Sequence, residues 1–189
     1  NELMLRLVEK NHGEFRLSFS ISGSLLEQLE AYRPDVLESF LELQQTGCVE
    51  WIGETYYHSL ASQYSRTEFV RQVEMHSDQI AEIFGVRPKV FRNTELLFSN
   101  DLVNEVVKMG FSGILVPSTE KLLKQRSPNH VYKTPLSNKL LCLPKNSSLT
   151  AELSRHFYTR EHENYPLSPL TFTSWLDDLG KEADCVNLF

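Results

Sequence analysis

The sequence predicts an α/β fold in which parallel strands alternate with helices, either as an open, doubly wound sheet or as a barrel. Segments whose apolar residues recur every three or four positions, as in amphipathic helices, alternate with short apolar runs typical of strands. Glycines stand where several helices should end, and Ser, Thr, Asn or Asp residues stand where helices should begin. Because strand–helix–strand units pair their strands in parallel, this alternation indicates a parallel sheet.

The first part of the chain shows the alternation most clearly. Apolar and polar residues alternate over residues 15–21, which predicts a strand, and Gly13 suits the left-handed end of the helix before it. We expect His76 to pack on the apolar face of its own helix. The remaining predicted elements, in chain order, are a helix at 25–32 capped by Ser24, a helix from Pro34 to Gly47, a strand at 48–52, a helix capped by Ser65 or Thr67 and closed by Gly85, a strand at 89–92, a helix opened by Asn100 or Asp101 and closed by Gly110, and a strand at 111–116.

After Pro117 the periodicity weakens. Ser168 followed by Pro169 is a good helix start, because serine caps a helix and proline suits its first turn. The elements expected in this part are a short helix at 118–123, strands at 131–132 and 140–143, a loop around 145–148, the helix that begins at Ser168 and ends at Gly180, and a last strand at 185–189.

The composition is that of a single globular domain and excludes several classes of protein. The chain has 189 residues, 41% of them hydrophobic, which is enough for a sizeable core. Its net charge of −6 disfavours non-specific binding to nucleic acid. No apolar run is long enough for a membrane helix, and no signal peptide is visible. Each of the three cysteines lies in an apolar run, so we expect buried, reduced thiols and a cytoplasmic location.

Both ends of the sequence are apolar, whereas natural termini are usually polar and poorly ordered. Residues 3–8 form a helical stripe without a capping run, and residues 185–189 end the sequence on an expected strand. We therefore expect residues 1–189 to be one fragment of a longer catalytic or binding domain.

In an open parallel sheet or a barrel, functional side chains follow the carboxyl ends of the strands. That rule selects residues 20–23, 53–59 and 93–95. Glu95 directly follows an apolar strand, where a charged group is unusual unless it is paired or used. It could be catalytic, or it could cap the next helix or pair with Arg92. Glu54 and His58 leave the same choice between a functional and a structural role, and Tyr57 could stack on a sugar ring or pack in the core.

Several other chemistries lack the residues that they need. No glycine-rich phosphate loop follows a strand, and no Gly-x-Ser-x-Gly nucleophile motif occurs. A metal site at the strand ends would need a His or Asn four residues after His58, where the chain has Ser62. Residues 177–178 are an Asp pair, but they lie in a late helix rather than at the end of an early strand. We therefore expect no metal and no cofactor.

Several stretches, taken together and in order, resemble glycoside hydrolase family 57, specifically its α-amylase-type branch. The most specific are Glu54-Thr55-Tyr56-Tyr57-His58-Ser59-Leu60 and Val90-Phe91-Arg92-Asn93-Thr94-Glu95-Leu96. Shorter matches extend the resemblance over nearly the whole chain, at residues 19–23, 46–50, 109–111, 127–129, 165–167 and 186–189.

The resemblance implies a partial (β/α)7 barrel, truncated at both ends, that acts on α-glucans such as starch, glycogen or maltodextrin with retention of configuration. It places the catalytic nucleophile on Glu95 and implies that His58, Glu54 and Tyr57 bind substrate. The family is not known for needing a metal. The general acid would be an Asp shortly after Phe189, so we expect the isolated segment to be inactive. We also expect it to associate, because open barrel edges and uncovered apolar strands resemble templates for aggregation.

Two other functions stay open. A metal-dependent polysaccharide deacetylase has a similar incomplete barrel, although Ser62 and the missing Asp pair disfavour it. A carbohydrate-binding remnant without catalysis is the second, although the presence of Glu95 and His58 argues against such a loss. The sequence does not separate hydrolysis from glucan transfer or branching.

Overall fold

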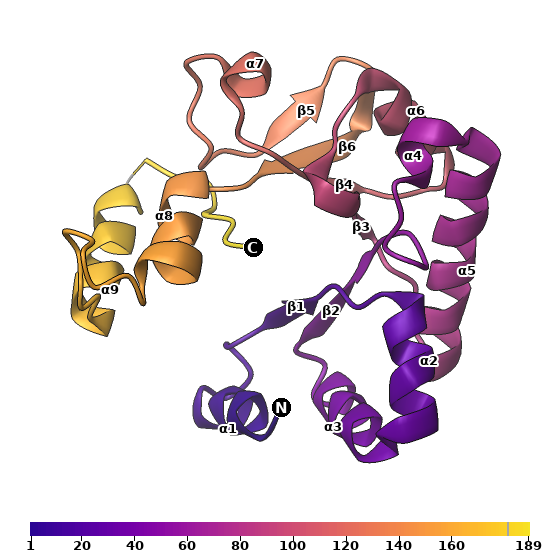
Figure 1. Cartoon of the computed structure of the whole chain (residues 1–189), viewed down its shortest axis with the longest axis horizontal. Coiled ribbons are helices and arrows are strands. Elements are labelled where there is room, and N and C mark those ends of the chain that lie inside the picture. The colour runs from indigo at the N-terminus through magenta and orange to yellow at the C-terminus, as the bar shows by residue number, and fades with distance from the viewer. Residues whose placement is uncertain (181) are drawn as a thin grey trace. The chain divides into compact units, whose positions relative to one another are not determined.

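The computed structural model describes residues 1–180 and 182–189. They form two compact units, residues 1–113 and residues 114–189 (Figure 1). Strands and helices alternate in the first unit, as the sequence pattern predicted. In the described part of the chain, no helix combines the length and apolar character that crossing a membrane would require.

The first unit contains three parallel strands in the order β1-β2-β3. They are β1 Leu17–Phe19, β2 Val49–Gly53 and β3 Val90–Arg92. Leu17 pairs with Val49, so β1 and β2 start level, whereas β3 starts opposite Ile52, further along β2. Because the strands are parallel, their carboxyl ends face the same edge of the sheet. The parallel pairing is confirmed, but the first strand is shorter than the predicted 15–21, and the second lies one residue later than predicted.

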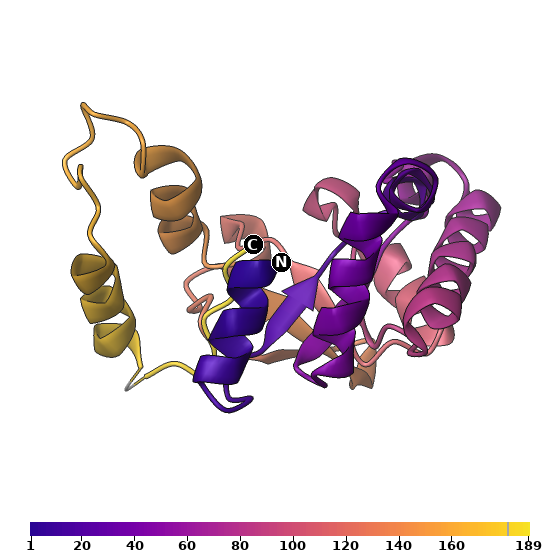
Figure 2. The same ribbon diagram turned by 90° about the horizontal axis from the view of Figure 1, so that it is seen from below.

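Helices lie beside these strands (Figure 2). They are α1 Glu2–Lys10, α2 Gly23–Tyr32, α3 Pro34–Gln45, α4 Ala61–Tyr64, α5 Arg66–Phe84, the 3-10 helix η1 Thr94–Leu96, and α6 Asn100–Lys108. In the described part of the first unit, α2 and α3 connect β1 to β2, and α4 and α5 connect β2 to β3, while α1 precedes β1 and η1 and α6 follow β3.

The core of this unit is built around Trp51 on β2. Its ring stacks on Phe84 of α5 with 3.7 Å between ring centroids, and Phe19 of β1 lies 5.7 Å away. Leu26 of α2 and Ile80 of α5 belong to the same buried cluster. Burying this apolar surface fixes α2 and α5 against the strands, which sets where the loops after the strands emerge.

Side-chain caps explain where the helices begin. Ser65 caps α5, because its hydroxyl accepts a hydrogen bond from the backbone N–H of Glu68, and Ser99 caps α6 in the same way. The expected cap at Ser24 is wrong, whereas the expected start of a helix at Asn100 is confirmed. Ser22 caps α2 through the N–H of Leu25, and α6 begins at Asn100 after its Ser99 cap.

The second unit is less regular and carries an antiparallel pair of strands. Its strand order is β4-β6-β5, with β4 Gly113–Val116, β5 Tyr132–Thr134 and β6 Ser137–Pro144. The antiparallel strands β5 and β6 are joined by two residues. The helical segments of this unit are α7 Glu120–Leu123, α8 Ser147–Ala151, one π-helical turn η2 Glu152–His156, and α9 Pro169–Leu179.

Three expectations in the second unit are wrong. The loop expected around residues 145–148 runs into α8, because the side chain of Asn146 caps a helix there. The strand expected at 185–189 is reduced to one parallel bridge between Lys145 and Asn187. Cys185 is half-buried, whereas Cys48 and Cys142 are buried as expected, and all three thiols are free.

Candidate active site

The loops after β1, β2 and β3 bring polar side chains from distant parts of the sequence together. Ser20 follows β1, Glu54 and His58 follow β2, and Glu95 follows β3. All four belong to the first unit. The structure therefore places the expected residues at one edge of the parallel strands, the position from which such sheets and barrels act on ligands.

Glu54 is a buried carboxylate that holds His58. The residue is only 2% exposed. Its Oε1 accepts a hydrogen bond of 2.8 Å from the Ser20 hydroxyl, and its Oε2 lies 2.8 Å from Nδ1 of His58. Both carboxylate oxygens therefore have partners within the protein. This arrangement fixes the imidazole with its proton on Nδ1 toward Glu54 and leaves Nε2 facing away from Glu54.

Glu95 lies on the other side of that imidazole. Its side chain is 74% exposed, and its Oε1 is 3.9 Å from Nε2 of His58. Arg92 forms no ion pair with Glu95 among the described residues, although the sequence suggested such a pair. An exposed carboxylate beside an imidazole that a buried carboxylate orients can attack an electrophilic carbon while the imidazole holds a neighbouring hydroxyl.

The backbone is left-handed at three positions of this site. His58 has φ 51°, Glu95 has φ 54°, and Leu96 has φ 53°. Residues other than glycine rarely adopt this conformation, which costs about 1–2 kcal/mol for each residue. Such conformations cluster at functional sites, where the surrounding structure enforces them. No local pattern of residues indicates them.

Hydrogen bonds between loops enforce this backbone. The Nδ2 atom of Asn93 donates to the carbonyl oxygen of Leu97 at 2.9 Å and to the Ser62 hydroxyl at 3.0 Å. The hydroxyl groups of Thr55 and Thr94 are 3.0 Å apart and join the loop after β2 to the loop after β3. The positions of Glu95 and His58 are thus coupled through buried polar groups.

His76 forms a hydrogen bond with the backbone of Glu54, a contact that sequence reasoning missed. Its ring is fully buried, as expected for the apolar face of α5, but it also makes specific polar contacts. Nε2 lies 2.8 Å from the carbonyl oxygen of Ile21, and Nδ1 accepts a long hydrogen bond of 3.5 Å from the backbone N–H of Glu54. Burial lowers the pKa of His76 below its usual 6.5, so the ring is neutral at pH 7. The one available signal was a polar residue on an otherwise apolar helix face.

Tyr57 adjoins His58 and is exposed, which leaves its ring free to stack on a ligand. Its neighbour Tyr56 is buried and packs edge-on against it, with ring centroids 4.9 Å apart. The Tyr56 hydroxyl donates to Glu27 at 2.6 Å. Burial, followed by the contact with Glu27, raises the pKa of Tyr56 to about 12, so this hydroxyl stays a proton donor. Of the two tyrosines, Tyr57 is the exposed one, and the buried Tyr56 packs against it.

The site offers no set of metal ligands of the kind that a deacetylase-type centre would need. Ser62 stands where a second histidine would be required, and its hydroxyl accepts from Asn93. Within residues 1–180 and 182–189, the one group of three side chains with metal-ligating atoms close together is Glu152, His156 and His162, in the second unit.

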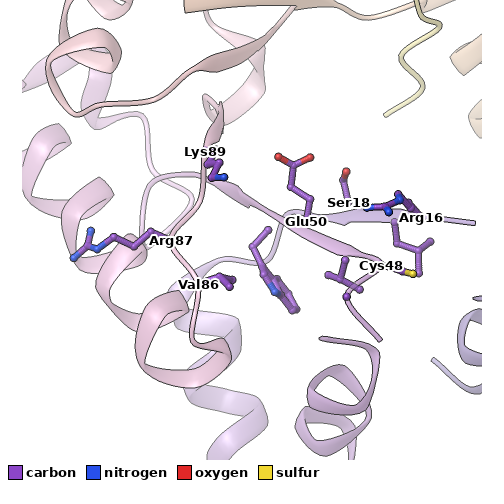
Figure 3. Close-up of a pocket in the computed structure, with 11 residues that line it drawn as sticks. Arg16, Ser18, Cys48, Glu50, Val86, Arg87 and Lys89 are labelled. Carbon is purple, nitrogen blue, oxygen red and sulfur yellow. The ribbon is translucent and has the colours of Figure 1, made fainter. Parts of the chain in front are cut away.

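A cavity of about 380 Å³ lies at the opposite end of the same strands (Figure 3). It is lined by residues at or before the strand starts, among them Arg16 of the approach to β1, Cys48 before β2 and Lys89 before β3. Parallel-strand enzymes bind their substrates beyond the carboxyl ends instead. We therefore assign the candidate site to Glu95 and His58, not to this cavity.

Comparisons with known proteins identify the family of this chain. The sequence model of glycosyl hydrolase family 57 matches residues 1–189. The chain belongs to glycosyl hydrolase family 57. A protein of Methanocaldococcus jannaschii named "Putative alpha-amylase" is 38% identical over 190 residues, which cover all of this chain and 39% of that protein. The chain thus spans about two fifths of the length of that curated relative.

Solved structures show the same fold. The 4-alpha-glucanotransferase of Thermococcus litoralis matches 93% of this chain and 27% of its own, with a TM-score of 0.71 and 20% identity. A protein of Mycobacterium smegmatis described as a "putative polysaccharide deacetylase" matches 79% of this chain and 46% of its own, with a TM-score of 0.58 and 14% identity. The family 57 chain therefore has the α/β fold of a partial (β/α)7 barrel, as predicted.

Proposed function

We propose that the protein containing this chain is a retaining glycoside hydrolase that acts on α-glucans, and that Glu95 is its nucleophile. The observation that carries the proposal is the row of three side chains in which exposed Glu95 faces His58, and His58 is held by buried Glu54. Membership of family 57 and the likeness to an α-amylase-named relative support the same substrate class.

In the proposed first step, a carboxylate oxygen of Glu95 attacks the anomeric carbon of the glucan. The new carbon–oxygen bond forms as the glycosidic bond breaks, and a second carboxyl group protonates the departing sugar oxygen. In the second step, water attacks the same carbon, the second carboxylate takes its proton, and Glu95 leaves. Two inversions give net retention.

Glu54 does not suit the role of the general acid. It is buried, and each of its oxygens already has a partner, Ser20 or His58. A retaining enzyme needs the acid about 5–5.5 Å from the nucleophile and in reach of the leaving oxygen. We therefore propose that Glu95 is the nucleophile and that a carboxyl group other than Glu54 is the acid.

His58 and Tyr57 are proposed to bind the sugar next to Glu95. With its Nδ1 proton directed at Glu54, His58 presents Nε2 as an acceptor for a sugar hydroxyl. The exposed Tyr57 ring offers an apolar face of the kind on which sugar rings stack. The proposed place of action is the cytoplasm, where the free thiols of the chain would stay reduced.

The test is the variant Glu95→Gln, assayed by the release of reducing ends from starch or maltodextrin. We expect a loss of turnover of about 10³-fold or more, because the amide is not a nucleophile. Folding should be unaffected, since the side chain is exposed. The matched control is Glu74→Gln, an exposed glutamate on α5 away from the site. Comparable turnover by Glu95→Gln and by the control would overturn the proposal.

Glucan transfer is a related reaction that we would assay separately, because the Thermococcus litoralis protein is named a glucanotransferase. Transfer uses the same glycosyl intermediate, with a sugar hydroxyl in place of water. Product analysis on a short maltooligosaccharide separates the two. Hydrolysis yields only shorter products, whereas transfer also yields longer ones.

The two remaining candidates have specific tests as well. A metal-dependent deacetylase would release acetate from an acetylated oligosaccharide and lose this activity with a chelator. A carbohydrate-binding remnant would bind maltodextrin without cleaving it, even when the chain is joined to the rest of its protein. Ser62 disfavours the metal-dependent deacetylase, and the exposed Glu95 disfavours the non-catalytic remnant.

A further inference from the structure

A cluster of nitrogen and oxygen ligands lies in the second unit, on elements that the glucan site does not use. Glu152 and His156 are the first and last residues of η2, and His162 comes from the segment after it. Their three potential ligand atoms all lie within 4.8 Å of one another. From this arrangement we propose that Glu152, His156 and His162 bind a zinc ion.

The distances fit a zinc centre after small side-chain adjustments. Nδ1 of His156 lies 3.0 Å from Oε1 of Glu152, and Nδ1 of His162 lies 3.9 Å from Oε2 of the same carboxylate. With zinc–ligand bonds of 2.0–2.1 Å in a tetrahedron, ligand atoms are about 3.3 Å apart. The three groups are therefore close enough to share one ion, although the two separations involve different oxygens of Glu152, so the side chains would turn to bind it.

The surroundings orient the ligands. All three side chains are half-buried, and the two imidazole rings stack with their centroids 3.8 Å apart. One ring would have to turn out of this stack so that both Nδ1 atoms face the same ion. Nδ2 of Asn164 donates to Oε2 of Glu152 at 3.2 Å, a contact of the kind that orients carboxylate ligands around metals. The backbone N–H of Asn164 also donates to Nδ1 of His162 at 3.3 Å, and zinc would replace this long hydrogen bond.

The donor set selects the class of ion. Calcium and magnesium prefer oxygen ligands, of which this cluster offers one side chain. Two imidazoles and one carboxylate suit zinc, and a water molecule can complete the tetrahedron. Because Glu152 and His156 stand on η2 and His162 lies beyond the segment 157–161, the ion would close that segment into a short loop. The proposed role of the ion is to hold this loop.

The experiment uses the protein that contains this chain, stripped with a chelator and titrated with zinc chloride alone by calorimetry. We expect one zinc per chain at this site and a higher melting temperature with zinc, because an ion that binds only the folded state stabilises it. The double variant His156→Gln/His162→Gln should lose at least about 100-fold in zinc affinity.

Two further variants make the test decisive. Asn tolerates the left-handed backbone of the exposed His12, so His12→Asn removes an imidazole elsewhere and should bind zinc like the unaltered protein. Glu152→Gln keeps the size of the carboxylate and should weaken binding, even if the double variant folds poorly. Zinc affinity and stoichiometry unchanged in Glu152→Gln, or no zinc uptake by the unaltered protein, would overturn the proposal.

Discussion

The Nε2 atom of His58 lies 3.9 Å from Oε1 of Glu95, although the two residues follow different strands. This separation is too long for a direct hydrogen bond. It does leave room for a sugar beside both side chains. In the proposed mechanism, a sugar hydroxyl donates to Nε2 of His58, which holds the sugar next to the carboxylate of Glu95 that attacks it.

The first prediction concerns how Glu54 positions His58. Glu54→Ala removes both hydrogen bonds of the buried carboxylate, so the imidazole is free to rotate. We expect kcat/KM on maltodextrin to fall by about 100-fold, the cost of misplacing a catalytic-site group by about 1 Å. The control is Glu74→Ala, which removes an exposed glutamate of α5, and its kcat/KM is measured on the same substrate.

Glu54→Gln distinguishes orientation from a simple loss of packing. The amide keeps the shape of the carboxylate, its oxygen can accept from Nδ1 of His58, and its NH₂ group can donate to the Ser20 hydroxyl. We expect this variant to retain more activity than Glu54→Ala. Equal losses in the two variants would show that orientation of His58 is not what Glu54 supplies.

The second prediction concerns pH and stability. Burial lowers the pKa of His76 below 6.5, against smaller upward effects from Ile21 and Glu54. Between the folded and unfolded pKa values, the unfolded chain binds a proton that the folded chain does not. The free energy of unfolding should therefore fall as the pH drops below about 6.5, with a slope of up to about 1.4 kcal/mol per pH unit.

His76→Gln isolates this contribution, because the other titrating groups are the same in both proteins. The measurement is urea unfolding between pH 7.5 and 5, and the relevant quantity is the difference between the two slopes. We expect a flatter dependence for His76→Gln. Parallel curves would mean that the neutral form of His76 is not favoured by folding.

The third prediction settles which residue starts α5, the helix that carries His76. The Ser65 hydroxyl accepts from the N–H of Glu68, whereas Thr67 lies inside the first turn. Ser65→Ala should lower the free energy of unfolding by about 1 kcal/mol. Thr67→Ala should change it by only a few tenths, because alanine is the better helix former there. The reverse order in chemical denaturation would contradict the assigned cap.

The sequence predicted the parts of the fold that depend on local patterns. The apolar stripe and terminal glycine of α5 suffice to define it, because its buried face repeats with the helical period. The sequence did not show that α2 begins at Gly23 after a Ser22 cap. A Cβ on Gly23 would lie 2.4 Å from the ring of Tyr56, a contact from the loop after β2 that no local pattern contains.

The second unit shows the same limit. The segment 145–148 lacks a helical apolar period, so the Asn146 cap of α8 was overlooked, and the apolar run at 185–189 forms one bridge instead of a strand. For the site, the rule of strand ends and the family resemblance selected Glu95, His58, Glu54 and Tyr57. The left-handed backbone and the contact of His76 with Glu54 depend on how separate loops pack, which spacing along the chain does not encode.

The fourth prediction tests the central proposal, that Glu95 forms a covalent bond to the sugar. The protein is treated with 5-fluoro-α-glucosyl fluoride, whose fluoride leaves without a general acid and whose ring fluorine slows release of the sugar. Peptide mass spectrometry should find one fluoroglucosyl group on Glu95, and none in the Glu95→Gln variant. A stable sugar adduct on a different carboxylate, with Glu95 unmodified, would contradict the account.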